Sequence, residues 1–403
     1  NQRISSIEYH RKIGIIRFPK KTSNLNPQSD TSIQFQGSVR RSGFDRVDLF
    51  FNDDLSTGNQ NQIIIDTVMG AFITNSKLRG KISNENQSDI VVRNGPLWIH
   101  NTEMELDNIT IGNGELSVQD STAKLRNLQI LGSATSAMRM TRDTLVTTSS
   151  NASTLSSNLE VGNGSLVNVS GSFSNQGAIF LETGGWLTVL EGDDPILPDR
   201  LTTPGGIPSE INIAGDSNFD DALAALAMVP EGDVDPVALF QSQVEGSRLG
   251  TGVLLLNNGL VENQVVNNVG GALISSGGEI RDSDFALSLG GSILVTHEPL
   301  LFLRNRVTGT GLIQVQPDGE LLLESLDIGD DVNDPFSLVI RNRGTLLTRG
   351  VVNFLENTTL INEGFFADDE TFSGARELYL EKMTQVGGLT RLYGYLSSNQ
   401  PID

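Results

Sequence analysis

Hydrophobic and polar positions alternate in short runs along most of the chain, and from residue 250 to 395 these runs repeat about every twenty residues. Each unit has a turn residue, with one flanking position four residues before it and another two residues after it. Both flanking positions are apolar in six of the seven units. A fixed period of this size predicts a solenoid. The turn residues are Gly259, Gly278, Pro299, Gly319, Gly344, Gly364 and Gly388.

The two flanking positions define the columns that we expect to stack inside the solenoid. The column before the turn contains Leu255, Ile274, Val295, Val315, Ile340, Leu360 and Thr384. The column after the turn contains Val261, Ile280, Leu301, Leu321, Leu346, Phe366 and Thr390.

Earlier parts of the chain fit the same frame with looser spacing, at residues 33–39, 90–98 and 173–180. Period-two alternation in these runs predicts strands with one face turned inward. We therefore expect a first solenoid section over residues 32–190 and a second over residues 249–403. A basic arm with a polar linker precedes them at residues 1–31.

Residues 191–248 interrupt the pattern with six prolines and many aspartates. Within them, Asp220 to Val229 has acids in its first turn and Pro230 directly after its end, which predicts a helix. We expect this segment to be a lateral insertion or a small cap, because insertions in repeat proteins map to loops on one face.

The short repeat is compatible with leucine-rich repeats or with β-helix coils. The fixed Asn or Cys of the leucine-rich consensus is absent, and the units have no helical half. Branched residues, alternation and Gly/Asn turns favour strands. The predicted fold is an all-β, right-handed parallel β-helix with one partly helical insertion.

Composition excludes several function classes. The formal charge is −21, which argues against nucleic acid as a partner because nucleic-acid binding requires a basic face. Cysteine is absent, which excludes disulfides and thiolate metal sites, and no run approaches 18 apolar residues. Because the chain begins with Asn1 and has no signal-peptide pattern, we expect a processed or excised chain.

The first 21 residues carry six basic residues against one acid, a net charge of +5. A run from 12 to 18 in this arm is predicted to form a strand. It is interpreted either as an ordinary first strand or cap with a solvated basic face, or as an arm that adds to an open edge of another copy. The residues of the predicted self-assembly arm are Arg11, Lys12, Ile13, Ile15, Ile16 and Arg17.

The sequence Gly-x-Leu-x-Val at residues 114–118, together with Gly-Gly-x-Leu further on, resembles pectate-lyase-like β-helices and the β-helical passengers of bacterial adhesins. The resemblance covers most of the chain and is one of architecture. Some β-helices of this kind cut polysaccharides with clustered surface acids, so the resemblance implies acid pairs as candidates. Adjacent strand residues point to opposite faces, so no such pair forms a site by itself. The pairs are Asp53–Asp54, Asp193–Asp194, Asp330–Asp331 and Asp368–Asp369.

One string matches the first oxygen ligands of a calcium loop: Asp216, Asn218 and Asp220. It departs where Asp221 replaces the required glycine, so capping of the predicted helix is the alternative. Calcium is the one cofactor that we consider. A second acidic turn, at residues 327–334, is expected to be surface. The histidines His10, His100 and His297 lack metal-ligand spacing and are expected to be surface or turn residues.

Six Asn-x-Ser/Thr sequons are present, for which chance matches are the default in a chain rich in these residues. They begin at Asn86, Asn108, Asn151, Asn163, Asn168 and Asn357.

Three functions remain open on these observations. The first is an extracellular or cell-surface structural or adhesive protein, non-enzymatic, that assembles with copies of itself as a filament or surface-layer subunit or attaches to surface glycans. The second is a polysaccharide lyase or hydrolase of the tailspike type. The third is a glycan-binding module. We expect no membrane span and no nucleic-acid partner.

Overall fold

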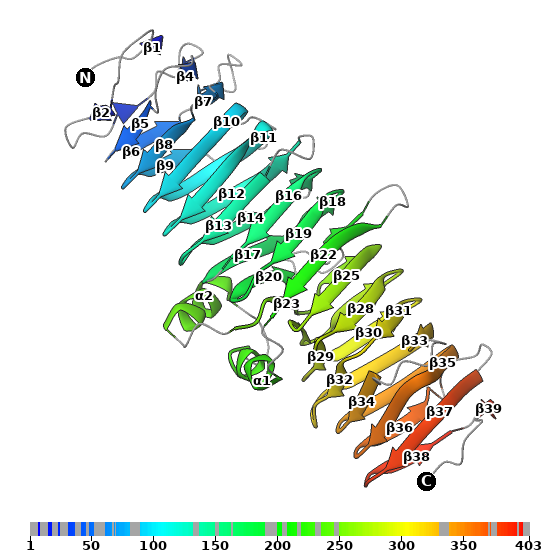
Figure 1. Cartoon of the computed structure of the whole chain (residues 1–403). Helices are drawn as coiled ribbons and strands as arrows, with labels where there is room; N and C mark the ends of the chain where they lie inside the picture. The colour runs from blue at the N-terminus through cyan, green and yellow to red at the C-terminus, as the bar shows by residue number, and fades with distance from the viewer. Residues whose placement is uncertain are drawn as a thin grey trace. The chain divides into compact units, whose positions relative to one another are not determined.

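The computed structural model describes residues 61–397 apart from a set of gaps, and short strands before residue 61 (Figure 1). The gaps are 67, 69, 81–88, 132–136, 150–152, 163, 190–199, 204–207, 216–218, 230–234, 246–249, 330–337, 370, 372–376 and 393–394. The described residues form a parallel β-solenoid of about 12 turns with two short helices, which confirms the predicted architecture. The right-handed winding stays a prediction. The chain divides into two compact units, residues 1–179 and 180–403.

In unit 1 (residues 1–179), every coil contributes strands to three parallel ladders. The first ladder contains β1 (Ile7–Glu8), β4 (Thr31–Gln36), β7 (Asn61–Asp66), β10 (Ile90–His100), β11 (Glu103–Gln119), β12 (Thr122–Ile130), β15 (Ser153–Leu155) and β18 (Ser172–Asn175). The second adds β2 (Ile15–Arg17), β5 (Ser42–Asp45), β8 (Ala71–Thr74), β13 (Ala137–Thr141), β16 (Asn158–Val161) and β19 (Ala178–Leu181). The third adds β3 (Ser23–Asn24), β6 (Asp48–Phe51), β9 (Lys77–Gly80), β14 (Leu145–Ser149) and β17 (Ser165–Ser170).

Unit 2 (residues 180–403) repeats this plan. Its first ladder contains β20 (Gly185–Val189), β23 (Val253–Leu256), β26 (Ala272–Ser275), β29 (Ser292–Val295), β32 (Leu312–Val315) and β34 (Leu338–Asn342). The second contains β21 (Arg200–Thr202), β24 (Leu260–Glu262), β27 (Gly278–Arg281), β30 (Pro299–Leu303), β33 (Glu320–Ile328), β35 (Thr345–Asn362), β36 (Phe365–Asp368) and β38 (Leu389–Arg391). The third adds β22 (Ser209–Ala214), β25 (Gln264–Val269), β28 (Asp284–Ser288), β31 (Arg306–Gly309), β37 (Glu377–Gln385) and β39 (Tyr395–Ser397).

Alternation along the strands places aliphatic side chains inside, where equivalent residues of successive coils lie on one another. In unit 1, Ile90 pairs with Ile109, and Ile109 with Leu128, all fully or almost fully buried. Fully burying one such side chain contributes about 1.5–3 kcal/mol. The stacked rows therefore supply the main stabilisation of the fold.

Buried amides and hydroxyls form a second kind of row at the corners. Asn127 Nδ2 donates to Asn108 Oδ1 at 2.6 Å in unit 1, and Asn342 Nδ2 donates to Asn362 Oδ1 at 2.7 Å in unit 2. A buried amide needs such a partner, because an unsatisfied polar group costs about 1–3 kcal/mol. The amide rows therefore fix the register between successive coils.

The turn glycines of unit 2 form a column because the backbones of successive coils touch there. The peptide N–H of Phe365 donates to the carbonyl oxygen of Gly344 at 2.8 Å, and the N–H of Leu389 donates to that of Gly364 at 2.9 Å. A Cβ added to Gly364 would lie 2.2 Å from the Gly344 oxygen. The glycines are therefore required by close approach of the backbone.

The predicted columns are correct in part. Leu255 pairs with Ile274, Ile340 with Leu360, and Leu346 with Phe366, as expected. Around Pro299 the register is wrong by one residue: Leu301 is half-buried, while Leu300 and Phe302 point into the core. Pro299 is the first residue of β30 and does not occupy the turn. Positions counted from Pro299 are therefore displaced by one residue from the side chains that face the core.

Two helices replace the single one that the sequence predicts. The first, α1 (Phe219–Ala227), matches the prediction and packs against β29. The second, α2 (Pro236–Glu245), has the N-cap Asp235, whose carboxylate accepts a hydrogen bond from Val237 N at 2.9 Å. Figure 1 shows both helices beside the strands of unit 2.

Candidate functional site

The coils of unit 1 turn between two ladders at one residue with a left-handed backbone. Asn75, Asn101 and Asp120 have φ values of 51°, 47° and 47° and occupy this corner in three successive coils. Asn and Asp are the side chains that best tolerate this conformation after glycine. The corner therefore selects short polar side chains and directs them outward.

A hydroxyl residue follows each corner and points inward. Ser76, Thr102 and Ser121 are buried, and each hydroxyl donates to the carbonyl two residues before it at 2.6–3.0 Å. The N–H of Thr102 also donates to Ser121 Oγ at 3.0 Å. These bonds hold each corner and link it to the next coil.

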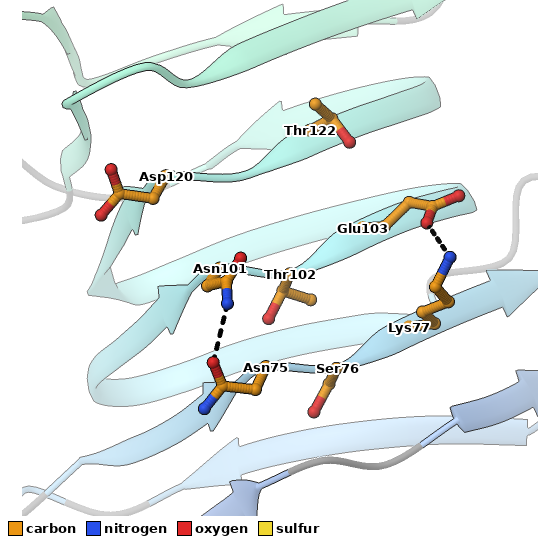
Figure 2. A pocket seen from close by; sticks show the side chains of 8 residues that line it. All are labelled: Asn75, Ser76, Lys77, Asn101, Thr102, Glu103, Asp120 and Thr122. Atoms are coloured by element: carbon orange, nitrogen blue, oxygen red, sulfur yellow. Dashed lines mark hydrogen bonds and ion pairs between the residues drawn. The ribbon is translucent and has the colours of Figure 1, made fainter.

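The outward amides of the corners form a directional row. Asn75 Nδ2 donates to Asp45 Oδ1 at 2.9 Å, and Asn101 Nδ2 donates to Asn75 Oδ1 at 2.8 Å. Each side-chain amide thus donates a hydrogen bond to the preceding coil. The Asn101 oxygen consequently points away from Asn75, as Figure 2 shows, toward the coil that carries Asp120.

An open depression of about 420 Å³ lies over these corners. All of its lining side chains are polar or charged, and they come from β9, the starts of β11 and β12, and the corners between them (Figure 2). They are Asn75, Ser76, Lys77, Asn101, Thr102, Glu103, Asp120 and Thr122. The volume lies within the range of about 300–1,000 Å³ seen for small-ligand sites, but the apolar lining usual in such sites is missing.

Two charged contacts border the depression. The Lys77 ammonium forms an ion pair with Glu103, and this hydrogen bond holds the pKa of the Glu103 carboxyl below its ordinary value. On the other side, His100 Nε2 lies 2.9 Å from Asp120 Oδ2. Both contacts are exposed to solvent, so they position the side chains more than they stabilise the fold.

In unit 2, the corner between β24 and β25 and the same corner of later coils carry a charge pair. Asn263, Asp282, Arg304 and Ser325 have left-handed φ values of 51–57° there. The Arg304 guanidinium donates to both oxygens of Asp282 at 2.7 Å, which lowers the pKa of that carboxyl. A left-handed corner of unit 2 thus carries an ion pair, whereas the left-handed corner described in unit 1 leaves acceptors facing solvent.

The residues around the depression were not predicted as a site. Their sequence signal is an Asn or Asp followed by Ser or Thr, at Asn75, Asn101 and Asp120, with spacings of 26 and 19 residues. His100, predicted as an ordinary surface residue, lies at the rim through its contact with Asp120.

One predicted acid pair lies among the described residues, and both of its side chains are buried. Arg349 Nε donates to Asp369 Oδ2 at 2.5 Å, and the Thr371 hydroxyl donates to Asp369 Oδ1 at 2.6 Å. Asp368 is 7% exposed. This arrangement is typical of a structural contact. The pairs at 53–54, 193–194 and 330–331 lie outside the described residues.

The predicted calcium string is described only at Asp220, which lies in the first turn of α1. Asp216 and Asn218 lie outside the described residues, so the calcium site stays a prediction. Within the described part of the chain, no group of three or more His, Cys, Asp or Glu side chains is placed to hold a metal ion.

The basic arm is described at its second half. Ile15, Ile16 and Arg17 form β2, which pairs in parallel with β5 through Ile15 and Gly43. This segment is therefore a rung of the solenoid, as the first-strand interpretation expects. Arg11, Lys12 and Ile13 lie outside the described residues, and their role in assembly stays a prediction.

Three of the six sequons lie on buried asparagines. Asn108, Asn168 and Asn357 are 1%, 3% and 8% exposed, respectively. An oligosaccharide attached to a side-chain amide has no room inside the coil stack. Asn86, Asn151 and Asn163 lie outside the described residues.

Comparisons with known proteins give a distant match among solved structures. No protein-family description matches the chain, and no curated protein matches its sequence. Among solved structures, the crystal structure of a TibC-catalysed hyper-glycosylated TibA55–350 fragment is 13% identical. The match covers 82% of this chain and 98% of that fragment, with a TM-score of 0.22. In the described residues, neither helix is long and apolar enough to cross a membrane.

Proposed function

We propose that this chain is an extracellular or cell-surface structural protein that attaches to surfaces or to copies of itself, and that it is not an enzyme. The observation that supports this most directly is the parallel stacking of coils inside each unit, in a register that shifts at only a few described positions. In unit 2, strands from β23 through β26 and β29 to β32 pair residue by residue. Such a stack is a rigid scaffold that presents a long outer surface.

The outer surface of the described residues suits contact with other molecules in water. Opposite charges on neighbouring coils pair across it, such as Arg281 with Glu262 at 2.9 Å and Arg341 with Glu363 at 2.6 Å. With a formal charge of −21, the chain stays soluble while its polar side chains remain available for contact. Both properties favour attachment in an aqueous, exposed location.

The state of the described acid pair disfavours a polysaccharide-cleaving enzyme. A hydrolase of this kind needs two carboxyls about 5–10 Å apart that reach the substrate. Asp369 is held by Arg349 and Thr371, and the adjacent Asp368 is buried. The enzymatic alternative is an outcome that the experiment below must exclude.

The purified chain should be studied by sedimentation velocity and negative-stain microscopy over a range of protein, salt and calcium concentrations. Its retention on cell surfaces and on immobilised polysaccharides should be measured in parallel. We expect concentration-dependent assembly, retention on a surface, or both. Dispersed particles under every condition, combined with no retention, would remove the proposal. Release of sugar fragments from a polysaccharide panel would replace it with the enzymatic function.

The basic arm offers a specific variant for this test. Reversing two charges together, Arg11→Glu and Lys12→Glu, is expected to reduce assembly if the arm docks on the acidic body of another copy. Reversing Lys124→Glu together with Lys382→Glu is a matched control, because both are exposed cations, on β12 and β37. Equal assembly of both variants would assign self-association to another surface.

A further inference from the structure

We propose that the depression over Asn75, Asn101 and Asp120 binds a neutral saccharide, about two sugar units long, through its hydroxyl groups. This inference rests on the proposed attachment function and names the partner of one surface. The lining side chains, the direction of the amide row and the spacing of the coils each support it.

The direction of the amide row turns one acceptor toward the next coil. Asn101 uses its Nδ2 to donate to Asn75, so its oxygen faces the coil of Asp120. The Asp120 carboxylate on that coil offers a second set of acceptor oxygens; it is turned away from Asn101 in Figure 2, and its Oδ2 lies 2.9 Å from His100 Nε2. Each of these acceptors can receive a hydrogen bond from a hydroxyl group, and the several hydroxyls of a saccharide supply more than one donor.

The rest of the lining fits hydroxyl groups better than ions or apolar ligands. Thr122 offers a hydroxyl that both donates and accepts, next to Glu103 on the neighbouring strand. Lys77 is already paired with Glu103. One cation and two carboxylates among the eight residues give a local charge of −1, which disfavours an anionic sugar. Apolar side chains are absent from the lining, which disfavours an apolar ligand.

The spacing of the corners matches the repeat of a saccharide chain. Successive coils are about 4.8 Å apart, which is similar to the length of one pyranose unit in an extended chain. The depression spans three corners and therefore accommodates about two units. Arg142 occupies the next corner, with φ 52°, and brings a larger, charged side chain. The polar row therefore ends there, which limits the length of the ligand.

A left-handed corner in unit 2 shows a contrasting arrangement. There, Arg304 donates to both oxygens of Asp282, so the carboxylate has its donors within the protein. In unit 1 the carboxylate of Asp120 contacts His100 through one oxygen, at 2.9 Å. A left-handed corner thus carries an acid with a bidentate partner in unit 2 and an acid with room for further donors in unit 1.

The decisive variant is Asp120→Asn. Asn is isosteric with Asp and tolerates the left-handed corner, so the coil is preserved. The substitution replaces one acceptor oxygen with an NH₂ donor and removes the charge. We expect saccharide binding to weaken by about tenfold or more, the effect of losing a hydrogen bond to a charged group. The thermal midpoint should be unchanged or higher, which separates loss of binding from loss of fold.

Two further variants complete the set. Thr122→Val removes a hydroxyl from the lining and should weaken binding several-fold. Glu105→Gln is the control, because Glu105 is exposed on β11 two residues from Glu103 and outside the depression. Binding of the whole chain would be surveyed on an array of neutral and anionic oligosaccharides, and the best neutral disaccharide or trisaccharide would be titrated by calorimetry.

Binding of a neutral saccharide that Asp120→Asn weakens and Glu105→Gln leaves intact would support the site. No neutral saccharide bound at millimolar concentration, or binding equally strong in both variants, would overturn it, as would binding of anionic glycans alone. If Asp120→Asn leaves saccharide binding unchanged while the native chain attaches to surfaces or assembles, the saccharide site fails and the attachment function stands. If the native chain neither attaches nor assembles, the proposed function itself fails.

Discussion

Replacing Gly364 with alanine tests the idea that turn glycines are required by the closeness of neighbouring coils. The new Cβ would lie 2.2 Å from the carbonyl oxygen of Gly344 and 2.7 Å from the carbonyl carbon of Arg343. Both are backbone atoms, which cannot rotate away. The φ angle of Gly364 is outside the left-handed region, so the clash with the coil below is the whole effect.

The size of the effect follows from the displacement that the clash requires. Ordinary contact begins near 3.4 Å, so the two backbones must separate by about 1.2 Å, the difference between 3.4 and 2.2 Å. The hydrogen bond from Phe365 N to Gly344 O, at 2.8 Å, would lengthen beyond useful range. Overpacking costs about 1–3 kcal/mol, and the lost bond adds about 1 kcal/mol. We expect a total loss of about 2–4 kcal/mol.

Gly387→Ala is the matched control, because a Cβ there would lie 3.8 Å from its nearest neighbour, the Glu363 oxygen. Its stability should be unchanged or higher by about 0.4–1 kcal/mol, since alanine restricts the unfolded chain. Urea unfolding followed by far-ultraviolet circular dichroism would compare the two variants with the native chain. Equal midpoints for Gly364→Ala and Gly387→Ala would refute the close-approach argument.

Three further predictions concern the interior and the sequons. Asn127→Ala removes the donor to Asn108 and should destabilise the chain by about 1–3 kcal/mol in urea unfolding, whereas Asn94→Ala, at an exposed position, should change stability by less than about 0.5 kcal/mol. Hydrogen bonds from Thr371, with Arg349 adding to them, hold the pKa of Asp369 below its ordinary value. Its ionised form therefore stabilises the folded chain above the unfolded pKa, near 4, and this contribution is lost as the pH falls through the folded value. Asp369→Asn should lower the urea midpoint at pH 7 and have little effect at pH 2; an equal loss at both would contradict this account. The buried sequons Asn108, Asn168 and Asn357 should carry no glycan when the chain is secreted from a glycosylating host and examined by mass spectrometry. A glycan found on any of these three residues in folded protein would refute the burial argument.

The glycine column could be predicted from the sequence because one physical requirement recurs in every coil. Gly344 and Gly364 each stand where a side chain would strike the backbone of the coil below, so spacing alone reveals the register. The spacing does not reveal the cause, because a turn that needs a left-handed residue also selects glycine. Gly388, with φ 67°, meets both requirements.

The register around Pro299 could not be predicted, because the local sequence is apolar on both faces. Leu300, Leu301, Phe302 and Leu303 form a continuous apolar run, and either alternate set would fill the core. A shift by one residue exchanges the faces of a strand. Which face turns inward depends on which side chains fit the neighbouring coils. Phe302 fits because its ring packs against that of Phe285 on the preceding coil, with the ring centroids 5.2 Å apart.

The second helix and the polar depression escaped prediction for different reasons. In α2, Leu239 is buried while Val237 is 38% exposed, so the amphipathic pattern is faint. Its cap, Asp235 followed by Pro236, was the available signal. The depression depends on corners from three coils. Each Asn-Ser or Asp-Ser pair is ordinary by itself, and their alignment requires the exact coil lengths.

The parallel stacking of coils has a mechanical consequence. Equivalent rungs are separated by 19 residues at Ile90 and Ile109, 20 at Ala272 and Ser292, and 25 at Glu320 and Thr345. Each coil is held by its neighbours alone. A chain pulled from one terminus should therefore unravel one coil at a time, each step releasing about 70–90 Å of extended chain. The force record would then follow the coil lengths in order, and a surface attachment built on this fold would lengthen in small increments before it detached.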